Sequence, residues 1–442
     1  MSTMIPTASA LLTPESLLDP FHEGRKPRDL WRVGTEHEKL ALDGRTGLQL
    51  PYRAGPGGPG ILTLLEHLAS HFGWEPFFED GRIIALTRDS ASITLEPGGQ
   101  FELSGAPCAT IHDTRRELDG HVTELQALTE AFGVTWQWVG MNPTQALPDI
   151  DWIPKERYAI MRRYLATRGR NYDSMMKLTC TVQANLDYSN KADAARKIRT
   201  SQALAPVVTA MFANSPLAGG APTGYMSTRQ HIWTEVDPDR CGLLPFVFEG
   251  PFGFEDYATW ALKVPMFFIH REGRYVDMAG IPFETFLRDG YRGFTPTVAD
   301  WELHLSTLFP ETRLKRYIEV RSADCVPPEL ICALPALWKG VLYDNEAMNA
   351  AWLLVADLNL RERVALLDTS ARTALDGSLG GRPMKAVALD LLDIATAGLR
   401  RQACLDEQGN DESVYVEPLR ERVVRGEPPA VDVLRRYGFG AA

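Results

Sequence analysis

The stretch Ala91-Ser-Ile-Thr-Leu-Glu-Pro-Gly-Gly-Gln-Phe-Glu-Leu-Ser104 alternates polar and apolar residues on either side of a Pro-Gly-Gly step. Such a step is typical of a tight turn, so the stretch predicts a β-hairpin. Because successive side chains of a strand point to opposite faces, the hairpin has one apolar and one polar face. The apolar face carries Ile93, Leu95, Phe101 and Leu103, and the polar face carries Ser92, Thr94, Glu96, Gln100, Glu102 and Ser104.

Three further segments, residues 31–39, 178–187 and 314–321, show strand-like alternation and extend the predicted sheet. Their polar faces carry Glu36 and Glu38 in the first segment, Gln183 and Asn185 in the second, and Glu319 and Arg321 in the third. His37 points to the opposite face, as a packing or hydrogen-bonding residue. Each of these pairs, taken alone, also fits a solvated strand or a surface ion pair worth about 0–1 kcal/mol.

The polar faces of these strands are able to line one common concave side of the sheet. That side would carry five carboxylates, namely Glu36, Glu38, Glu96, Glu102 and Glu319. Five carboxylates in one place repel and raise one another's pKa values unless cations neutralise them. Hard oxygen ligands favour Mg²⁺, or alternatively Mn²⁺, and Mg²⁺ is usually completed by substrate phosphates. With Arg321 to stabilise transferred charge, the set predicts a metal–nucleotide phosphoryl-transfer site.

Helices are predicted where apolar residues recur at helical spacing. They lie around residues 61–71, 110–132 and 191–212, and a short helix starts at Thr13-Pro-Glu15 with Thr13 as its N-cap. After Pro328 the segments 345–358, 385–402 and 431–437 are rich in Ala, Leu and Arg. The fold class is therefore α+β with an antiparallel sheet. We expect a single unit over residues 1–442, with a sheet-forming core at 31–327 and a mainly helical C-terminal layer at 328–442.

Composition excludes several classes of protein. The 442 residues carry 46 Lys and Arg against 57 Asp and Glu, a net charge of −11, with 45% hydrophobic residues. These are the proportions of a globular protein, and the acidic balance argues against a nucleic-acid partner. No segment approaches the roughly 20 apolar residues of a membrane helix, so we expect no membrane partner.

Residues 1–12 lack a Lys or Arg ahead of their apolar residues and do not resemble a secretory signal. The six cysteines are scattered, with no CxxC and no zinc-ligand spacing, which is typical of reduced thiols. We therefore expect a cytoplasmic protein. No P-loop or GxSxG motif is present, and residues 55–60 match GxGxxG only in letters, because their prolines favour a plain loop.

Several long motifs in the same strands resemble a known family. They are Gly34-Thr-Glu-His-Glu-Lys39, Leu95-Glu-Pro-Gly-Gly-Gln-Phe-Glu-Leu-Ser-Gly105, Met211-Phe-Ala-Asn-Ser-Pro216, His231-Ile-Trp-Thr234 and Leu314-Lys-Arg-Tyr-Ile-Glu-Val-Arg321. In this order, over residues 31–343, the chain resembles the plant and proteobacterial type of glutamate–cysteine ligase. The resemblance implies a glutamine-synthetase-like fold, in which a curved antiparallel sheet forms a funnel flanked by helices. It also implies that ATP phosphorylates the γ-carboxylate of L-glutamate and that the amine of L-cysteine then attacks, giving γ-glutamylcysteine, ADP and phosphate.

The resemblance assigns roles to residues that match the family's motifs. Glu36, Glu38, Glu96, Glu102 and Glu319 match metal-binding carboxylates, Gln183 and Asn185 a metal- or substrate-facing strand, and Arg321 the arginine that meets the phosphoryl group. Arg157 and Arg229 resemble the arginines that grip the glutamate carboxylate, for which a guanidinium fork is suited. Trp233 and Phe267 are candidates for the cysteine pocket. Ordinary ion pairs and plain core packing remain alternatives for these arginines and aromatic residues.

One departure from the family concerns a regulatory cysteine pair that plant members carry within the stretch matching residues 277–293. This chain has Met278 and no cysteine in that stretch, so we expect a monomer without a thiol switch. Cys325 and Cys332 pair only if a loop brings them together. Two alternatives to the ligase stay open: a related carboxylate–amine ligase with another amine acceptor, and a catalytically silent metal-binding protein. Retention of the five glutamates with Arg321 argues against the silent protein.

Overall fold

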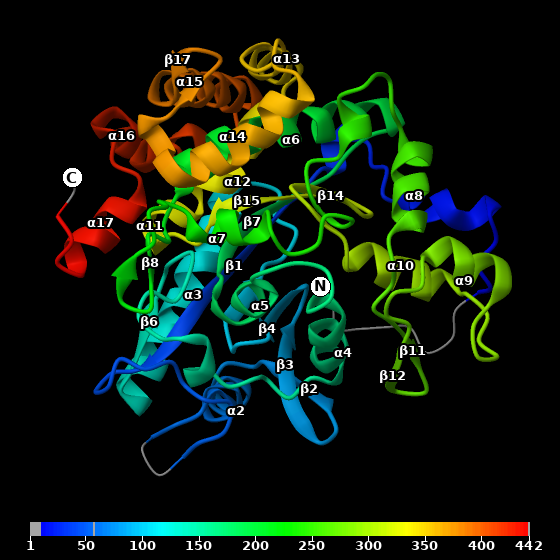
Figure 1. The fold of residues 1–442 in the computed structure, drawn as a ribbon. Coiled ribbons are helices and arrows are strands. Elements are labelled where there is room, and N and C mark those ends of the chain that lie inside the picture. The colour runs from blue at the N-terminus through cyan, green and yellow to red at the C-terminus, as the bar shows by residue number, and fades with distance from the viewer. Residues whose placement is uncertain (1–9, 56–57, 441–442) are drawn as a thin grey trace.

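The computed structural model describes residues 10–55 and 58–440, and an antiparallel sheet lies at its centre (Figure 1). Within the described residues the sheet has nine strands in the order β14-β15-β7-β1-β5-β4-β3-β2, with β6 paired to the far half of β1. The strands are β1 (Val33–Asp43), β2 (Glu75–Glu79), β3 (Arg82–Arg88), β4 (Ala91–Leu95), β5 (Phe101–Ser104), β6 (Val134–Gln137), β7 (Thr181–Leu186), β14 (Thr312–Leu314) and β15 (Ile318–Asp324). The predicted α+β class with an antiparallel sheet is confirmed.

The register of the sheet brings the predicted polar residues side by side. On β1, Glu36 lies opposite Gln183 of β7 on one side and opposite Ser104 of β5 on the other. Glu38 lies opposite Glu102, and Glu319 of β15 lies opposite Asn185. Because directly opposite residues of antiparallel strands share a face, these side chains form one continuous polar surface.

Three long helices begin and end close to the predicted positions. They are α2 (Ile61–His71), α3 (Ile111–Phe132) and α6 (Lys191–Phe212). Thr110 caps α3 in a reciprocal capping box with Asp113, and the side chain of Asn190 caps α6. The second half of α6 is buried between the apolar face of the sheet and the C-terminal helices.

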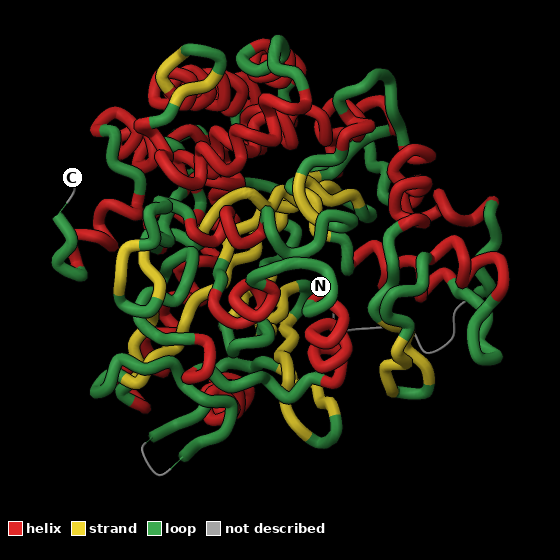
Figure 2. The backbone as a smooth tube through the Cα atoms, in the orientation of Figure 1, coloured by secondary structure: helices red, strands yellow, loops and turns green. Residues whose placement is uncertain are grey.

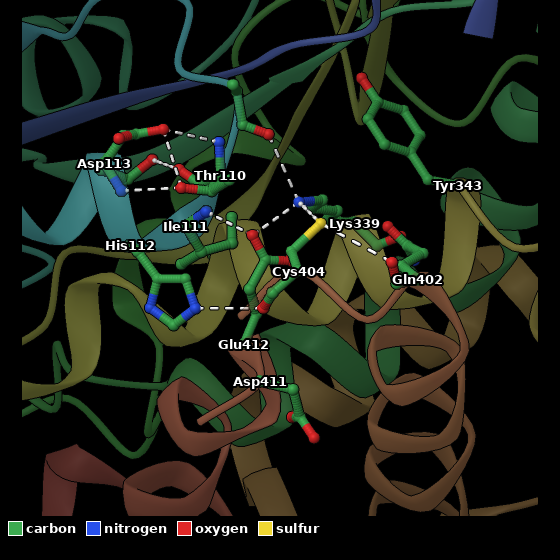
Figure 3. Close-up of polar contacts among 12 residues, drawn as sticks. Thr110, Ile111, His112, Asp113, Lys339, Tyr343, Gln402, Cys404, Asp411 and Glu412 are labelled. Atoms are coloured by element: carbon green, nitrogen blue, oxygen red, sulfur yellow. Dashed lines mark hydrogen bonds and ion pairs between the residues drawn. The ribbon is translucent and has the colours of Figure 1, made fainter. Parts of the chain in front are cut away.

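The C-terminal segment is mainly helical, and most of its helices lie at the top and on the left of the view in Figures 1 and 2. It contains α11 (Pro328–Ile331), α12 (Ala333–Leu342), α13 (Asn345–Leu353), α14 (Leu360–Thr373), α15 (Met384–Gln402), α16 (Glu417–Arg425) and α17 (Pro429–Arg436), with the two-residue strands β16 (Ser378–Leu379) and β17 (Arg382–Pro383). A buried ion pair fastens this layer to the start of α3: Lys339 Nζ lies 2.6 Å from Glu412 Oε1, which also accepts the Ile111 N–H at 2.7 Å (Figure 3).

Shorter elements complete the structure. The helices are α1 (Asp19–Glu23), α4 (Glu156–Leu165), α5 (Tyr172–Leu178), α7 (Thr228–Trp233), α8 (Phe254–Lys263), α9 (Phe283–Asp289) and α10 (Val298–Ser306). The strands are β8 (Leu217–Ala218), β9 (Ala221–Pro222), β10 (Cys241–Gly242), β11 (Phe268–Arg271), β12 (Arg274–Asp277) and β13 (Phe309–Pro310). Among the described residues, none of the helices is both long and apolar enough to span a bilayer.

The structure differs from the sequence predictions at several boundaries. Residues 314–321 are not one strand, because a turn at 315–317 separates β14 from β15. Residue 178 ends α5, so β7 starts only at Thr181. The first helix is a 3₁₀ turn over Glu15–Leu18 with Pro14, not Thr13, at its N-cap, and α13 ends at Leu353, before residue 358. Most of the stretch 1–12, and part of the loop at 54–60, lie outside the described residues.

Candidate functional site

The polar surface of the sheet borders a cavity of about 370 Å³. Most of the predicted site residues line it: Glu36, Glu38, Glu96, Glu102, Arg157, Gln183, Arg229, Trp233 and Arg321. The carboxylates come from β1 and from the hairpin, whereas Arg157 comes from α4, and Arg229 and Trp233 come from α7. The cavity therefore has an acidic wall on the sheet, and its basic groups come both from helices and from Arg321 of β15.

The acidic wall holds more negative charge than its own hydrogen bonds neutralise. Glu38 accepts the Thr181 N–H at 2.9 Å, and Glu102 accepts the hydroxyls of Thr94 and Ser104. Burial, together with the neighbouring charges of Glu96 and Glu102, raises the pKa of Glu38 well above its ordinary value. A cation placed at this wall would relieve that repulsion.

The donor chemistry at this wall fits a hard divalent cation. All the groups are oxygen donors, which Mg²⁺ and Mn²⁺ prefer. Asn185 donates through Nδ2 to Glu36 Oε1 at 2.7 Å, and its own Oδ1 is buried without a hydrogen-bond partner. Across the described parts of the chain, however, no three His, Cys, Asp or Glu side chains form a preassembled metal cluster. The residue types at the acidic wall therefore fit a metal ion, whereas the side chains as described do not converge on one point as metal ligands.

Glu319 is placed differently from the other four glutamates. Its side chain is fully buried and does not line the cavity. Arg313 donates to both of its oxygens at 2.7 and 2.8 Å, and Lys315 Nζ lies 2.8 Å away. Although burial opposes ionisation, Arg313, Lys315 and Arg321 together hold the pKa of Glu319 well below its ordinary value. In this structure Glu319 is thus an ionised carboxylate surrounded by three basic side chains, Arg313, Lys315 and Arg321.

Arg321 connects this cluster to the cavity. Its Nη1 donates to Glu319 Oε1 at 2.5 Å and to Gln183 Oε1 at 2.7 Å, and its guanidinium lies 5.6 Å from the Trp233 ring centroid. Sequence reasoning missed Arg313 and Lys315, which lie six and four positions before Glu319 in the sequence. The turn at 315–317 folds β14 back on β15 and places Arg313 directly opposite Glu319. These two basic groups keep Glu319 neutralised while Arg321 faces the cavity.

The two arginines that were predicted to bind the substrate, Arg157 and Arg229, both line the cavity. Arg229 is 3% exposed, donates through Nη2 to the Arg321 carbonyl at 3.0 Å, and has no hydrogen-bond partner at Nη1. Its nearest carboxylate is Asp324, whose Oδ1 lies 3.9 Å from Nη1. Arg157 lies against the Tyr158 ring, with its guanidinium 5.2 Å from the ring centroid. Buried guanidinium groups next to a cavity are suited to binding a planar carboxylate.

The two predicted aromatic residues separate. Trp233 lines the cavity, packs edge-on against Phe309, and has a buried Nε1 without a partner. Phe267 is 1% exposed and does not line the cavity. The Arg240 guanidinium lies 3.9 Å from the centroid of the Phe267 ring. Its neighbour Phe268 lines the cavity instead, because consecutive side chains of an extended chain point in opposite directions.

His37 lies on the other face of β1, as its position in the strand predicts. Its ring packs against those of His121 and Trp138 in the interior, with centroids 5.6 and 5.5 Å away. Burial and the nearby Lys39 charge lower its pKa well below the ordinary value, so the ring is neutral. His37 is a packing residue and takes no part in the cavity.

An antiparallel sheet that presents carboxylates, together with arginines, to one cavity has the groups of an enzyme that handles phosphates and carboxylate substrates. The comparisons with known proteins identify this class. The model of glutamate–cysteine ligase family 2 matches residues 32–440, and the chain belongs to that family. The resemblance predicted from the motifs is therefore confirmed.

The relatives agree with the family. The chloroplastic glutamate–cysteine ligase of Medicago truncatula is 42% identical over 433 residues, covering 97% of this chain and 83% of that protein. The chloroplastic glutamate–cysteine ligase of Brassica juncea is 43% identical, covering 97% and 82%. Among solved structures, a bifunctional glutathione synthetase from Pasteurella multocida superposes with a TM-score of 0.47 at 11% identity, covering 96% of this chain and 50% of that chain.

The predicted cytoplasmic location is wrong by this comparison, because these relatives are chloroplastic enzymes. The prediction relied on the lack of a secretory signal in residues 1–12 and on the scattered thiols. All six cysteines, which lie within the described residues, are indeed free thiols. Free thiols indicate a reducing compartment and do not distinguish the cytosol from the interior of a plastid.

Proposed function

We propose that this chain joins the γ-carboxylate of L-glutamate to the amine of L-cysteine, using ATP and passing through γ-glutamyl phosphate. Formation of γ-glutamylcysteine, the first step of glutathione biosynthesis, is the activity that the family and its relatives support. The observation that carries the proposal is the single cavity in which Glu36, Glu38, Glu96 and Glu102 face Arg157, Arg229 and Arg321.

In this proposal Arg229 and Arg157 bind L-glutamate. The Nη1 of Arg229, which makes no hydrogen bond in the structure, supplies a buried donor for the substrate α-carboxylate, and the Arg157 fork supplies a second positive group. Holding one end of the substrate fixes the direction of its γ-carboxylate. Such positioning makes the following step effectively unimolecular.

The acidic wall is proposed to hold Mg²⁺, with Mn²⁺ as a substitute, through Glu36, Glu38, Glu96 and Glu102, and Glu319 joins them if its cation cluster opens. When bound, the metal would neutralise phosphate oxygens of ATP and leave the γ-phosphorus open to attack. The γ-carboxylate oxygen of glutamate bonds to that phosphorus, and the bond to ADP breaks. Arg321 stabilises the charge on the transferred phosphoryl group.

The second half of the reaction needs an amine and the exclusion of water. Trp233 and Phe268 are proposed to form the apolar wall against which the cysteine side chain packs, replacing the earlier expectation for Phe267. The neutral amine attacks the γ-carbonyl carbon, phosphate leaves with the oxygen that came from the carboxylate, and the nitrogen releases a proton to the departing phosphate or to water as the amide forms. Bound substrates that fill the cavity would limit hydrolysis of the acyl phosphate by water.

We propose that one chain forms the active unit, since residues 277–293 lack the cysteine pair of the family's thiol switch, and that residues 328–442 act as a layer bracing the sheet. Light scattering at working concentration tests the first statement, and a dimer that dissociates with loss of activity would contradict it.

The test of the function is release of ADP with L-glutamate and a panel of amines. L-Cysteine should be strongly preferred, and equal rates with other amines would contradict the assignment of the acceptor. Glu96→Gln should abolish turnover, because it removes a carboxylate from the acidic wall. Glu255→Gln is the matched control, since Glu255 is exposed and pairs with Lys191 on the surface. Full turnover by Glu96→Gln would contradict the proposed metal site.

A further inference from the structure

The short helix α7 needs outside support to hold its residues in the cavity. It spans only Thr228–Trp233, yet it supplies both Arg229 and Trp233 to the wall. Isolated helices of this length are unstable in water, so their position depends on tertiary contacts. The question is which group fixes α7 relative to the sheet.

Asp324, the last residue of β15, makes these contacts. Its carboxylate is 1% exposed and accepts three hydrogen bonds, from the Asn214 N–H at 2.8 Å, the Ser215 hydroxyl at 2.6 Å and the Ser227 hydroxyl at 2.7 Å. A buried carboxylate with three donors is strongly constrained in direction.

The two serines pass this constraint on to α7. Ser227 is the N-cap of the helix, and its Oγ accepts the Gln230 N–H at 3.2 Å. Ser215 Oγ accepts the backbone N–H of Arg229 at 3.1 Å. Each serine hydroxyl therefore donates to Asp324 and accepts from the first turn of α7. The helix start and the backbone of Arg229 are tied to one carboxylate.

The sheet is adapted to place Asp324 there. The pairing of β15 with β7 shifts register between Val320 and Ala323, a bulge of the kind that redirects side chains near active sites. Gly140 lies against the carboxylate, and a Cβ at that position would come within 2.4 Å of Asp324. Any larger residue at position 140 would displace the carboxylate.

We propose that Asp324 is a positioning residue for the reaction, which acts through Ser215 and Ser227 to aim Arg229 at the carboxylate of L-glutamate. This inference rests on the proposed function and deepens it. Asp324 itself does not line the cavity, and its carboxylate lies 3.9 Å from Arg229 Nη1, beyond hydrogen-bond distance. Its effect is therefore on binding of L-glutamate and not on the chemical step.

The experiment compares Asp324→Asn with the wild-type enzyme in steady-state rates and in calorimetric titration with L-glutamate alone. Asparagine has the same size as aspartate, but its side-chain NH₂ group is a donor and cannot accept the hydrogen bonds that Asp324 receives. The variant should therefore lose hydrogen bonds that hold the start of α7. KM and Kd for L-glutamate should rise by about tenfold, with kcat changed by less than about threefold, because binding equal in ground and transition states moves KM alone. In an Arg229→Lys background the same change should have little further effect.

Glu412→Gln is the control, since Glu412 is a buried carboxylate of the C-terminal layer, away from the cavity. It should lower thermal stability and leave KM for L-glutamate unchanged. An unchanged KM in Asp324→Asn, or full additivity with Arg229→Lys, would overturn the inference.

If Asp324→Asn does not fold, the same measurements are made on Ser215→Ala, in which KM for L-glutamate should rise. An unchanged KM in Ser215→Ala would also overturn the inference. A wild-type enzyme that forms no γ-glutamylcysteine would refute the proposed function instead, while the calorimetric Kd would still report on Asp324.

Discussion

Replacing Arg321 with alanine removes a guanidinium that contacts the buried Glu319, Gln183 and the cavity. Arg321 Nη1 lies 2.5 Å from Glu319 Oε1 and 2.7 Å from Gln183 Oε1, and its side chain is 11% exposed. Glu319 keeps Arg313 and Lys315 in the variant, so its charge stays compensated and the fold should persist. The loss should therefore fall on catalysis.

The size of the loss follows from the proposed role. Removing one preorganised group that stabilises developing charge lowers kcat by about 10²–10³-fold, equivalent to about 2.7–4 kcal/mol. Because Arg321 acts on the transferred phosphoryl group, KM for L-glutamate should change much less than kcat. Binding of L-glutamate stays with Arg229 and Arg157.

The assay is ADP release with saturating L-glutamate, L-cysteine and Mg²⁺-ATP, together with a thermal unfolding curve. Arg316→Ala is the matched control, because Arg316 lines the cavity, is 51% exposed and pairs with Glu23 and Glu302. It should retain near wild-type kcat. A kcat for Arg321→Ala within about fivefold of wild type, or an equal loss in the control, would refute the reasoning.

Three further outcomes are expected. Mg²⁺ at about 100 times its Kd should raise the free energy of unfolding by about 2.7 kcal/mol in thermal melts, and Glu38→Gln should reduce that gain; an equal gain in both would contradict metal binding at the acidic wall. Lys339→Met should destabilise the protein by about 3–5 kcal/mol in urea titrations because it leaves buried Glu412 unpaired, and no change would show the ion pair to be dispensable. Burial lowers the pKa of His304 from 6.5 to about 3, so its neutral form contributes stability above pH 6.5 that is lost as the pH falls toward 3. His304→Gln should therefore flatten the loss of stability below pH 6.5 by up to about 1.4 kcal/mol per pH unit, and an unchanged slope would contradict a neutral His304.

The sheet and its polar face could be predicted because strand alternation is a local signal. The hairpin around Pro97 and the period of two in β1 and β7 are both visible in the sequence, and the register then places Glu38 opposite Glu102. Nothing in the local pattern shows how deeply a polar residue is buried. Glu319 follows the alternation, yet it lies behind the cavity because β14 folds back to place Arg313 and Lys315 on it.

The support of α7 could not be predicted for a different reason. The hydrogen bonds of Asp324 join residues that are 97 to 110 positions away in the sequence. Single serines and a single aspartate have no periodic signal, and their partners become evident only when the fold brings them together. The choice between Phe267 and Phe268 could not be predicted either, because both are aromatic. Which of the two faces the cavity depends on where β11 starts.

In the proposed mechanism the γ-carboxylate of L-glutamate is activated by phosphorylation in this cavity. The most direct test uses L-glutamate labelled with ¹⁸O in the γ-carboxylate, incubated with the enzyme, Mg²⁺-ATP and L-cysteine. One labelled oxygen should appear in the released phosphate for each γ-glutamylcysteine formed, as mass spectrometry of the phosphate would show. Phosphate without the label, at full yield of product, would contradict the acyl phosphate and with it the proposed mechanism.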